Sequence, residues 1–155
     1  MNCATVTQRP SRRADEQRDR ILCAALQCFI EHGFHAASMA NIAETAGMSA
    51  GLMYRYFENK NAIVLAIISR QLEEKRCRIR MLQSSADFRA SLLEASEHWC
   101  TGERSGMNPA LFLEMSAEAT RDPQIAQALR ESDAIMRGEF QAWFSRSVAE
   151  GGLGF

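Results

Sequence analysis

The chain has 155 residues, of which 46% are hydrophobic, and this suits one compact domain or two small helical ones. Its 18 lysines and arginines nearly balance its 19 aspartates and glutamates, so the net charge of −1 excludes nucleic-acid binding through overall positive charge. The longest apolar run, residues 62–68, is too short to cross a bilayer, and we expect no signal peptide. The five cysteines lack the spacing of a zinc site, which favours reduced thiols in a cytoplasmic protein.

The first 13 residues contain three arginines and no acidic residue. We expect them to form a flexible basic arm, and two interpretations stay open: a solvated tail, or an arm that lies along the DNA minor groove. A helix should follow from about Arg13 to His32, with Gly33 at its end. Its apolar stripe is formed by Ile21, Leu22, Ala25, Phe29 and Ile30.

Residues 38–60 have the pattern of two short helices joined by a tight turn, with a third helix beginning at their end. Ser38 is a typical N-cap, and apolar residues follow it at helical spacing. Gly47 suits the left-handed conformation that is usual just past a helix end. Ser49 then caps a second helix, residues 50–57. A helix-turn-helix of this kind inserts its second helix into the DNA major groove.

The second helix divides into two faces when it is unrolled at about 100° per residue. The side that should face the core is formed by Met53, Tyr56 and Phe57. The opposite side presents Ala50 and Gly51, which allow a close approach to DNA, and Arg55, whose guanidinium can contact a guanine edge. Leu52 and Tyr54 flank this side, and the Tyr54 hydroxyl is well placed for a phosphate oxygen.

Lys60 follows Asn59, a predicted N-cap, so its charge should lie beside a positive helix end, and both favour phosphate. Each of these residues also has an interpretation that needs no DNA. Tyr54 and Tyr56 fit half-buried core aromatics, and Tyr56 fits packing best. Arg55 and Lys60 fit solvated surface charges, and the two serines are explained as caps. Their joint occurrence in register favours DNA binding.

Residues 15–65 resemble the N-terminal domain of TetR-type transcriptional regulators. The resemblance is carried by Ser38, Ile42, Ala43, Ala46, Gly47, Ser49, Gly51, Tyr54, Tyr56, Phe57 and Lys60. It implies a dimeric, mostly repressing regulator that a small molecule releases from DNA. By the same resemblance, phosphates are contacted by Ser38, Tyr54 and Lys60. Bases would be read by the helix around Ala50, Gly51 and Arg55. The chain departs from the family pattern at Ala50, where lysine is frequent, and at Asn61, where glutamate is frequent.

Downstream of this stretch the sequence predicts only helices. One should run from Asn59 to about Gln83, with an apolar first half and a charged second half that is typical of a solvated face. Later helix starts are marked by Ser85, by Asn108 with Pro109, and by Asp122 with Pro123. The last of these helices carries a long apolar stripe and should end at Gly151.

We therefore predict an all-α fold, in which an N-terminal three-helix helix-turn-helix domain of homeodomain-like form precedes a helical regulatory domain. The expected divisions are a basic arm at 1–13, the DNA-binding domain at 14–58, a connecting helix at 59–83, and a ligand-binding and dimerisation domain at 84–155 that we expect to be incomplete. The predicted DNA-contacting residues are Ser38, Ser49, Ala50, Gly51, Leu52, Tyr54, Arg55, Tyr56 and Lys60.

The predicted function is sequence-specific transcriptional regulation, as a ligand-responsive repressor that binds a palindromic operator as a dimer. Expected partners are double-stranded DNA, a second copy of the chain and a small-molecule inducer, with no cofactor, metal or membrane. The alternative is a truncated helical interaction or ligand-binding protein without independent operator binding. An enzyme is not expected, because the sequence has no Gly-rich phosphate loop, nucleophile elbow, paired catalytic carboxylates or metal cluster.

Overall fold

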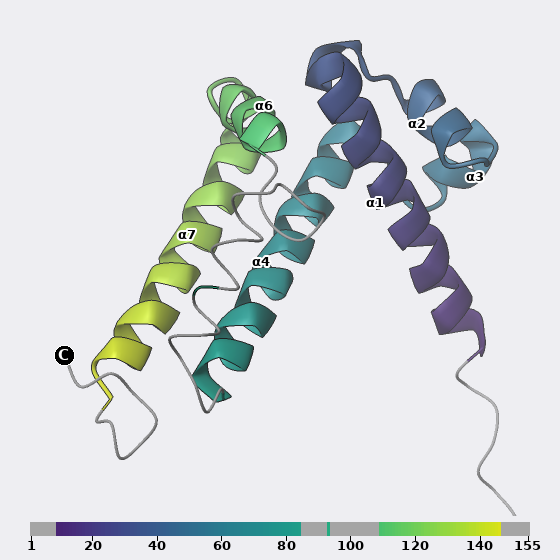
Figure 1. Cartoon of the computed structure of the whole chain (residues 1–155). Coiled ribbons are helices and arrows are strands. Elements are labelled where there is room, and N and C mark those ends of the chain that lie inside the picture. The colour runs from purple at the N-terminus through teal and green to yellow at the C-terminus, as the bar shows by residue number, and fades with distance from the viewer. Residues whose placement is uncertain (1–8, 85–92, 94–108, 147–155) are drawn as a thin grey trace, which may run out of the picture. The chain divides into compact units, whose positions relative to one another are not determined.

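The computed structural model describes residues 9–84, residue 93 and residues 109–146, and the long elements within them are all helices. The helices are α1 (Arg9–Ala36), α2 (Met39–Thr45), α3 (Ala50–Tyr54), α4 (Lys60–Ser84), α6 (Pro109–Ala119) and α7 (Pro123–Phe144) (Figure 1). The prediction of an all-α fold is therefore confirmed. The chain divides into two compact units, residues 1–63 and 64–155, with the division inside α4. Among the described helices, none is both long and apolar enough to span a membrane.

The first helix begins earlier than predicted. It starts at Arg9, so the part of the expected basic arm from 9 to 13 is helical, and that part of the prediction is wrong. A proline at position 10 does not prevent this start, because the first-turn N–H groups of a helix have no intrahelical partner to lose. Arg12 also pairs with Glu16 one turn further on, at 3.5 Å. Residues 1–8 of the expected arm lie outside the described residues.

Gly33 interrupts α1 as predicted. Its backbone has φ 78° and ψ 162°, a conformation that is essentially restricted to glycine, and a short helical turn follows as far as Ala36. The N–H of Ala37 then donates to the Gly33 carbonyl at 3.2 Å. The long helical part of α1 therefore ends at the residue where the sequence predicts its end, and the chain turns here toward α2.

The core of the first unit is formed where α1 packs on α2 and α2 packs on α3. The rings of Phe29 and Phe34 close one end of it, with their centroids 5.3 Å apart. Its most deeply buried side chains are Ile21, Ala25, Cys28, Phe29, Ala37, Ile42, Ala43, Met53 and Ile63. The predicted apolar stripe of the first helix is thus buried except for Ile30, which is 41% exposed. This core fixes the position of α2 and α3 relative to α1.

In the second unit, α6 packs on α7. Asp122 caps α7 as predicted, since its Oδ1 accepts hydrogen bonds from the N–H groups of Gln124 at 2.8 Å and Ile125 at 3.2 Å. Pro109 and Pro123 occupy first-turn positions, also as predicted. The buried apolar side chains of the two helices are Leu111, Met115, Ile125 and Trp143. The helix predicted to start at Ser85, apart from Leu93, lies outside the described residues.

The helix α7 ends at Phe144, earlier than the predicted end at Gly151. Ser145 is its C-cap, and the N–H of Ser145 donates to the Gln141 carbonyl at 3.0 Å. The helix therefore ends before the apolar pattern of the sequence does. Residues 147–155 lie outside the described residues.

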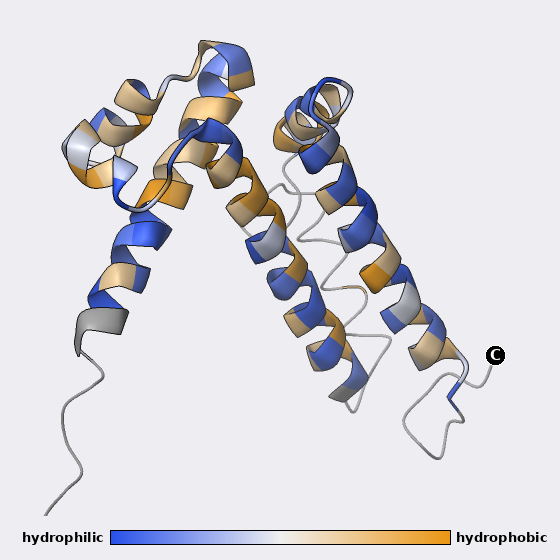
Figure 2. Ribbon diagram, turned by 180° about the vertical axis from the view of Figure 1, so that it is seen from behind, coloured by the Kyte–Doolittle hydropathy of each residue, from blue (hydrophilic) through white to orange (hydrophobic). Residues whose placement is uncertain are grey.

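The charged second half of α4 is used in packing as well as in solvation. The guanidinium of Arg76 donates from Nε to Oε1 of Glu139 on α7 at 2.5 Å and from Nη1 to Oε1 of Glu73 at 2.9 Å. The hydrogen bonds to Glu139 and Glu73 raise the pKa of Arg76 above its ordinary value. Figure 2 shows the predicted change along α4, from an apolar first half to a mostly hydrophilic second half. Arg76, whose side chain is 35% exposed, thus stays in contact with solvent and also connects α4 with α7.

Candidate nucleic-acid interface

The start of α2 is held by a reciprocal pair of hydrogen bonds. Oγ of Ser38 accepts from the N–H of Asn41 at 3.1 Å, and Oδ1 of Asn41 accepts from the N–H of Ser38 at 3.2 Å. This capping box confirms Ser38 as an N-cap and adds Asn41, whose part in it the sequence did not reveal. Two N–H groups at the start of α2 are satisfied in this way, which fixes where the helix begins.

The turn between α2 and α3 has the predicted form. Gly47 has a φ of 64°, in the left-handed region that favours glycine, and its N–H donates to the Glu44 carbonyl at 2.9 Å. Ser49 then caps α3, because its Oγ accepts from the N–H of Leu52 at 3.2 Å. The two helices are therefore joined by a short, hydrogen-bonded turn, as in a helix-turn-helix.

The helix α3 is shorter than the predicted 50–57. It ends at Tyr54, and Arg55 is its C-cap. The N–H groups of Tyr56 and Phe57 both donate to the Met53 carbonyl, at 2.9 Å and 3.0 Å, so the last turn is tight. Four residues after the C-cap of α3, Asn59 caps α4, where its Oδ1 accepts from the N–H of Ala62 at 2.8 Å. The predicted cap at Asn59 is confirmed.

The two predicted faces of α3 are separated in the structure. Met53 is 0% exposed and Phe57 3% exposed, whereas Tyr56 is half-buried. Exposed residues form the opposite face, and they are Ala50, Gly51, Tyr54 and Arg55. Leu52 is half-buried between the two faces. A Cβ added at Gly51 would meet no atom within 4 Å, so no contact inside the protein requires a glycine there. The small residues of this face are available to a molecule that approaches from outside.

The ammonium of Lys60 is engaged inside the first unit. Its Nζ lies 2.5 Å from the carbonyl oxygen of Phe34, 2.8 Å from that of Ala37 and 3.5 Å from that of His35. It also lies 4.2 Å from the centroid of the Phe34 ring. These carbonyls belong to the turn that connects α1 with α2, so Lys60 ties the start of α4 to that turn. The contact of Lys60 with DNA phosphate stays a prediction. In the structure Lys60 also has a role within the protein, since it binds these backbone carbonyls.

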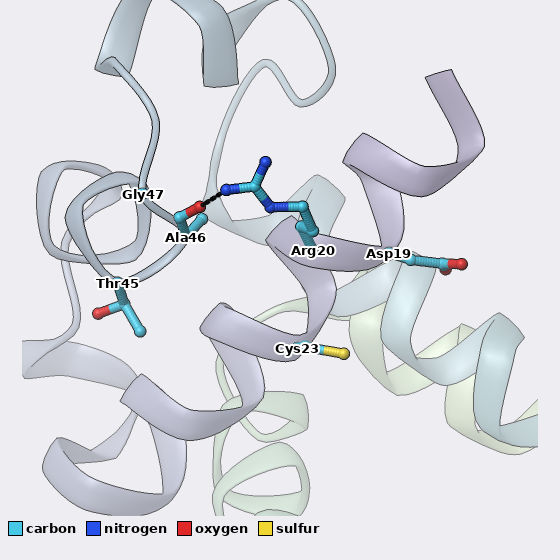
Figure 3. Close-up of a pocket in the computed structure, with 6 residues that line it drawn as sticks. All are labelled: Asp19, Arg20, Cys23, Thr45, Ala46 and Gly47. Carbon is cyan, nitrogen blue, oxygen red and sulfur yellow. Dashed lines mark hydrogen bonds between the residues drawn. The ribbon is translucent and has the colours of Figure 1, made fainter. Parts of the chain in front are cut away.

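Two arginines of α1 that the sequence did not single out reach the helix-turn-helix. Nη2 of Arg20 donates to the Ala46 carbonyl at 2.6 Å, as Figure 3 shows, and Nη1 of Arg18 donates to the Tyr56 carbonyl at 3.2 Å. The partners are 26 and 38 residues apart in the chain, so no local spacing indicates them. A shallow hollow of about 490 Å³ beside the Arg20 contact is lined by Asp19, Arg20, Cys23, Thr45, Ala46 and Gly47. Over the described ranges, no three His, Cys, Asp or Glu residues gather to hold a metal.

Comparison with known proteins agrees with this geometry. Residues 21–67 match the family profile described as "Bacterial regulatory proteins, tetR family". The chain is 33% identical over 142 residues to the HTH-type transcriptional regulator UidR of Escherichia coli (strain K12), a match that covers 90% of this chain and 69% of UidR. It is 36% identical over 84 residues to the HTH-type transcriptional activator FasR of Mycolicibacterium smegmatis, covering 54% of this chain and 38% of FasR.

A solved structure extends the likeness to the fold. Salmonella enterica GusR superimposes with a TM-score of 0.72 and 32% sequence identity, over 88% of this chain and 70% of GusR. The curated relatives are regulators of transcription by their names. With the match to the family profile and the exposed face of α3, these likenesses show that the chain belongs to the TetR family of DNA-binding transcriptional regulators.

Proposed function

We propose that this regulator is a repressor that binds a palindromic operator as a homodimer, with α3 in the major groove. The observation that carries the proposal is the division of α3: Met53 is buried to hold the helix, while Gly51 and Arg55 are exposed beside Ala50. A small, open start and a guanidinium near the end suit an element that must approach base edges closely and then contact a guanine. A dimer would present two such helices to two half-sites related by twofold symmetry.

The proposed DNA contacts divide by chemistry. Ala50, Gly51 and Arg55 would read bases, with Leu52 at the border of this face. Contacts with phosphate would come from Ser38, Ser49, Tyr54 and Lys60. Tyr54 supports this assignment best, because its side chain is 54% exposed and its hydroxyl is of the kind that binds phosphate oxygens. We assign Tyr56 mainly to packing, since it is half-buried.

The domain assignment completes the proposal. Residues 14–58 would bind DNA, and residues 84–155 would bind a small-molecule inducer and a second copy of the chain. Residues 59–83 would form the helix that connects these two domains. Support comes from the TetR-type resemblance and from α4, a single helix of 25 residues that starts in the first compact unit and ends in the second. A ligand that favours one orientation of such a helix would change how α3 is presented to DNA.

Replacing Arg55 with alanine tests the base-reading face. We expect the variant to lose about 1–3 kcal/mol of binding free energy at one base-pair position, and preference there to relax, because one bidentate contact is removed. The measurement compares wild type and R55A on a duplex that wild type selects from a random-sequence library, and on its single-base-pair variants.

The matched control for this measurement is Arg130→Ala. Arg130 is exposed on α7, so its replacement removes the same charge outside the proposed interface. R130A should keep the preference profile of wild type. If R55A also keeps that profile at every position, Arg55 does not read a base and the assignment of the exposed face is wrong.

A further inference from the structure

Two guanidinium groups of α1 reach the two ends of the segment that contains α3. Arg20 donates to the carbonyl of Ala46, the C-cap of α2, just before the turn that leads into α3. Arg18 donates to the carbonyl of Tyr56, just after the C-cap of α3, and its guanidinium carbon lies 4.5 Å from the centroid of the Phe57 ring. Both arginines therefore contact the backbone that enters and leaves the recognition helix.

The two carbonyls are suitable partners for cations. Ala46 is the C-cap of α2, and the last carbonyls of a helix have no intrahelical donor and carry the negative end of the helix dipole, so the Arg20 guanidinium satisfies an acceptor and adds a favourable charge interaction. Tyr56 lies just past the C-cap of α3, and its carbonyl accepts from Arg18 as a backbone acceptor outside the helix. Arg18 and Arg20 are two residues apart, roughly 200° around α1, which lets them reach different parts of the segment. A Cβ added at Gly47 would lie 3.3 Å from Nη2 of Arg20, which shows how closely this side chain lies against the turn.

The recognition helix needs such external support. With five residues, α3 is too short to be stable by itself. Within it only Met53 is buried. One buried side chain anchors this short helix in the core, and contacts at its two ends further restrict its rotation and tilt. Those ends carry the hydrogen bonds from Arg20 and Arg18.

We infer that Arg18 and Arg20 are positioning residues for DNA recognition: they set the orientation of α3 through the Tyr56 and Ala46 carbonyls and do not contact DNA themselves. This inference rests on the proposed function, since it concerns the same interface. It distinguishes two kinds of cationic side chain in the first unit. Some, such as Arg55, would face DNA, and others, Arg18 and Arg20, would fix the orientation of α3.

The test compares Arg18→Gln, Arg20→Gln and Arg20→Lys with Arg130→Gln, which removes an exposed charge from α7. Affinity is measured over a range of salt concentrations for a duplex that wild type selects from a random-sequence library and for a scrambled duplex. Hydrogen exchange of the Leu52 and Met53 amides, which both donate to the Ser49 carbonyl, reports the order of α3 without DNA. Far-UV circular dichroism confirms that each variant is folded.

We expect R18Q and R20Q to bind the selected duplex about tenfold more weakly, because each loses a hydrogen bond from a charged donor that orients α3. Binding to the scrambled duplex and the salt dependence should stay as in wild type, while exchange at Leu52 and Met53 becomes faster. R20K should recover part of the loss, since a single donor can serve the Ala46 carbonyl. R130Q should behave as wild type.

Three results would overturn the inference. A fall of about one in the salt slope, with both duplexes weakened alike, would show that the arginine contacts phosphate directly. Faster exchange with unchanged affinity for the selected duplex would show a role in stability alone. Unchanged exchange and affinity would show no role. If wild type itself selects no sequence, the proposed function fails and the role in DNA recognition fails with it, whereas faster exchange in R18Q and R20Q would still show that the two arginines order α3.

Discussion

Replacing Lys60 with methionine is expected to lower the free energy of unfolding of the first unit by about 2–3 kcal/mol, which is the scale of lost hydrogen bonds from a charged donor. Methionine keeps most of the aliphatic chain, so the change isolates the ammonium. The carbonyls of Phe34 and Ala37, which lie 2.8 Å or less from Nζ, then lose a donor, and the Phe34 ring loses the cation above it. The start of α4 should separate from the turn between α1 and α2.

Urea denaturation followed by far-UV circular dichroism measures this loss, with Arg130→Met as the matched control. Arg130 is exposed and has the same formal charge, so R130M should change stability little. Equal stability of K60M and wild type would show that the carbonyl contacts contribute nothing. The DNA contact predicted from the sequence has a separate signature, because a lost phosphate contact lowers the salt slope of binding by about one.

Replacing Ile42 with alanine should have the largest effect of any single change considered for the first unit. Ile42 is 0% exposed on α2, in the core that α2 shares with α1 and α3. Removing its buried carbons leaves a cavity, and we expect a loss of about 2–5 kcal/mol in the free energy of unfolding. Since small domains are stable by only about 5–15 kcal/mol, operator binding should weaken at moderately raised temperature.

The matched control for I42A is Ile30→Ala, which removes the same atoms from a side chain that is 41% exposed on α1. Thermal unfolding of both variants checks the prediction. I30A should lose less stability than I42A, since a smaller part of the Ile30 side chain leaves water on folding. Equal losses in the two variants would contradict the assignment of Ile42 to the core.

The features of the fold and of the interface that could be predicted are those set by neighbouring residues. A serine cap, a glycine that needs a positive φ and an aspartate before a proline each act within three or four residues. Ser38, Gly47 and Asp122 were therefore identified from the sequence, and each has its predicted role in the structure. The inward side of α3 could be predicted for the same reason, because helical spacing alone places Met53 and Phe57 together.

The side-chain contacts that join distant parts of the first unit could not be predicted in this way. Arg18, Arg20 and Lys60 each donate to a backbone carbonyl more than 20 residues away, and a carbonyl is present at every residue. A hydrogen bond from a long, flexible Arg or Lys side chain to a backbone carbonyl therefore produces no periodic pattern in the sequence. The contact of Arg76 with Glu139 could not be predicted either, because it depends on the placement of α7 beside α4.

The errors at helix ends have local causes. The first helix starts earlier than its apolar stripe indicates because Pro10 lies in its first turn, where proline is well tolerated. The predicted end of α3 is too late because helical spacing continues to Phe57, whereas the helix has its C-cap at Arg55 and Asn59 caps α4 four residues later. Helix ends depend on small differences between competing hydrogen bonds. The spacing of apolar residues therefore predicts the ends of a helix less accurately than its existence.

Sedimentation velocity of the purified chain with a fluorescent duplex tests operator binding most directly. The duplex is one that wild type selects from a random-sequence library, and a scrambled duplex of the same composition is the control. We predict a discrete complex that contains two protein chains on the selected duplex and a much weaker one on the scrambled duplex. A chain that stays monomeric and binds both duplexes alike would contradict operator binding as a dimer, and would favour a helical interaction protein without independent operator binding.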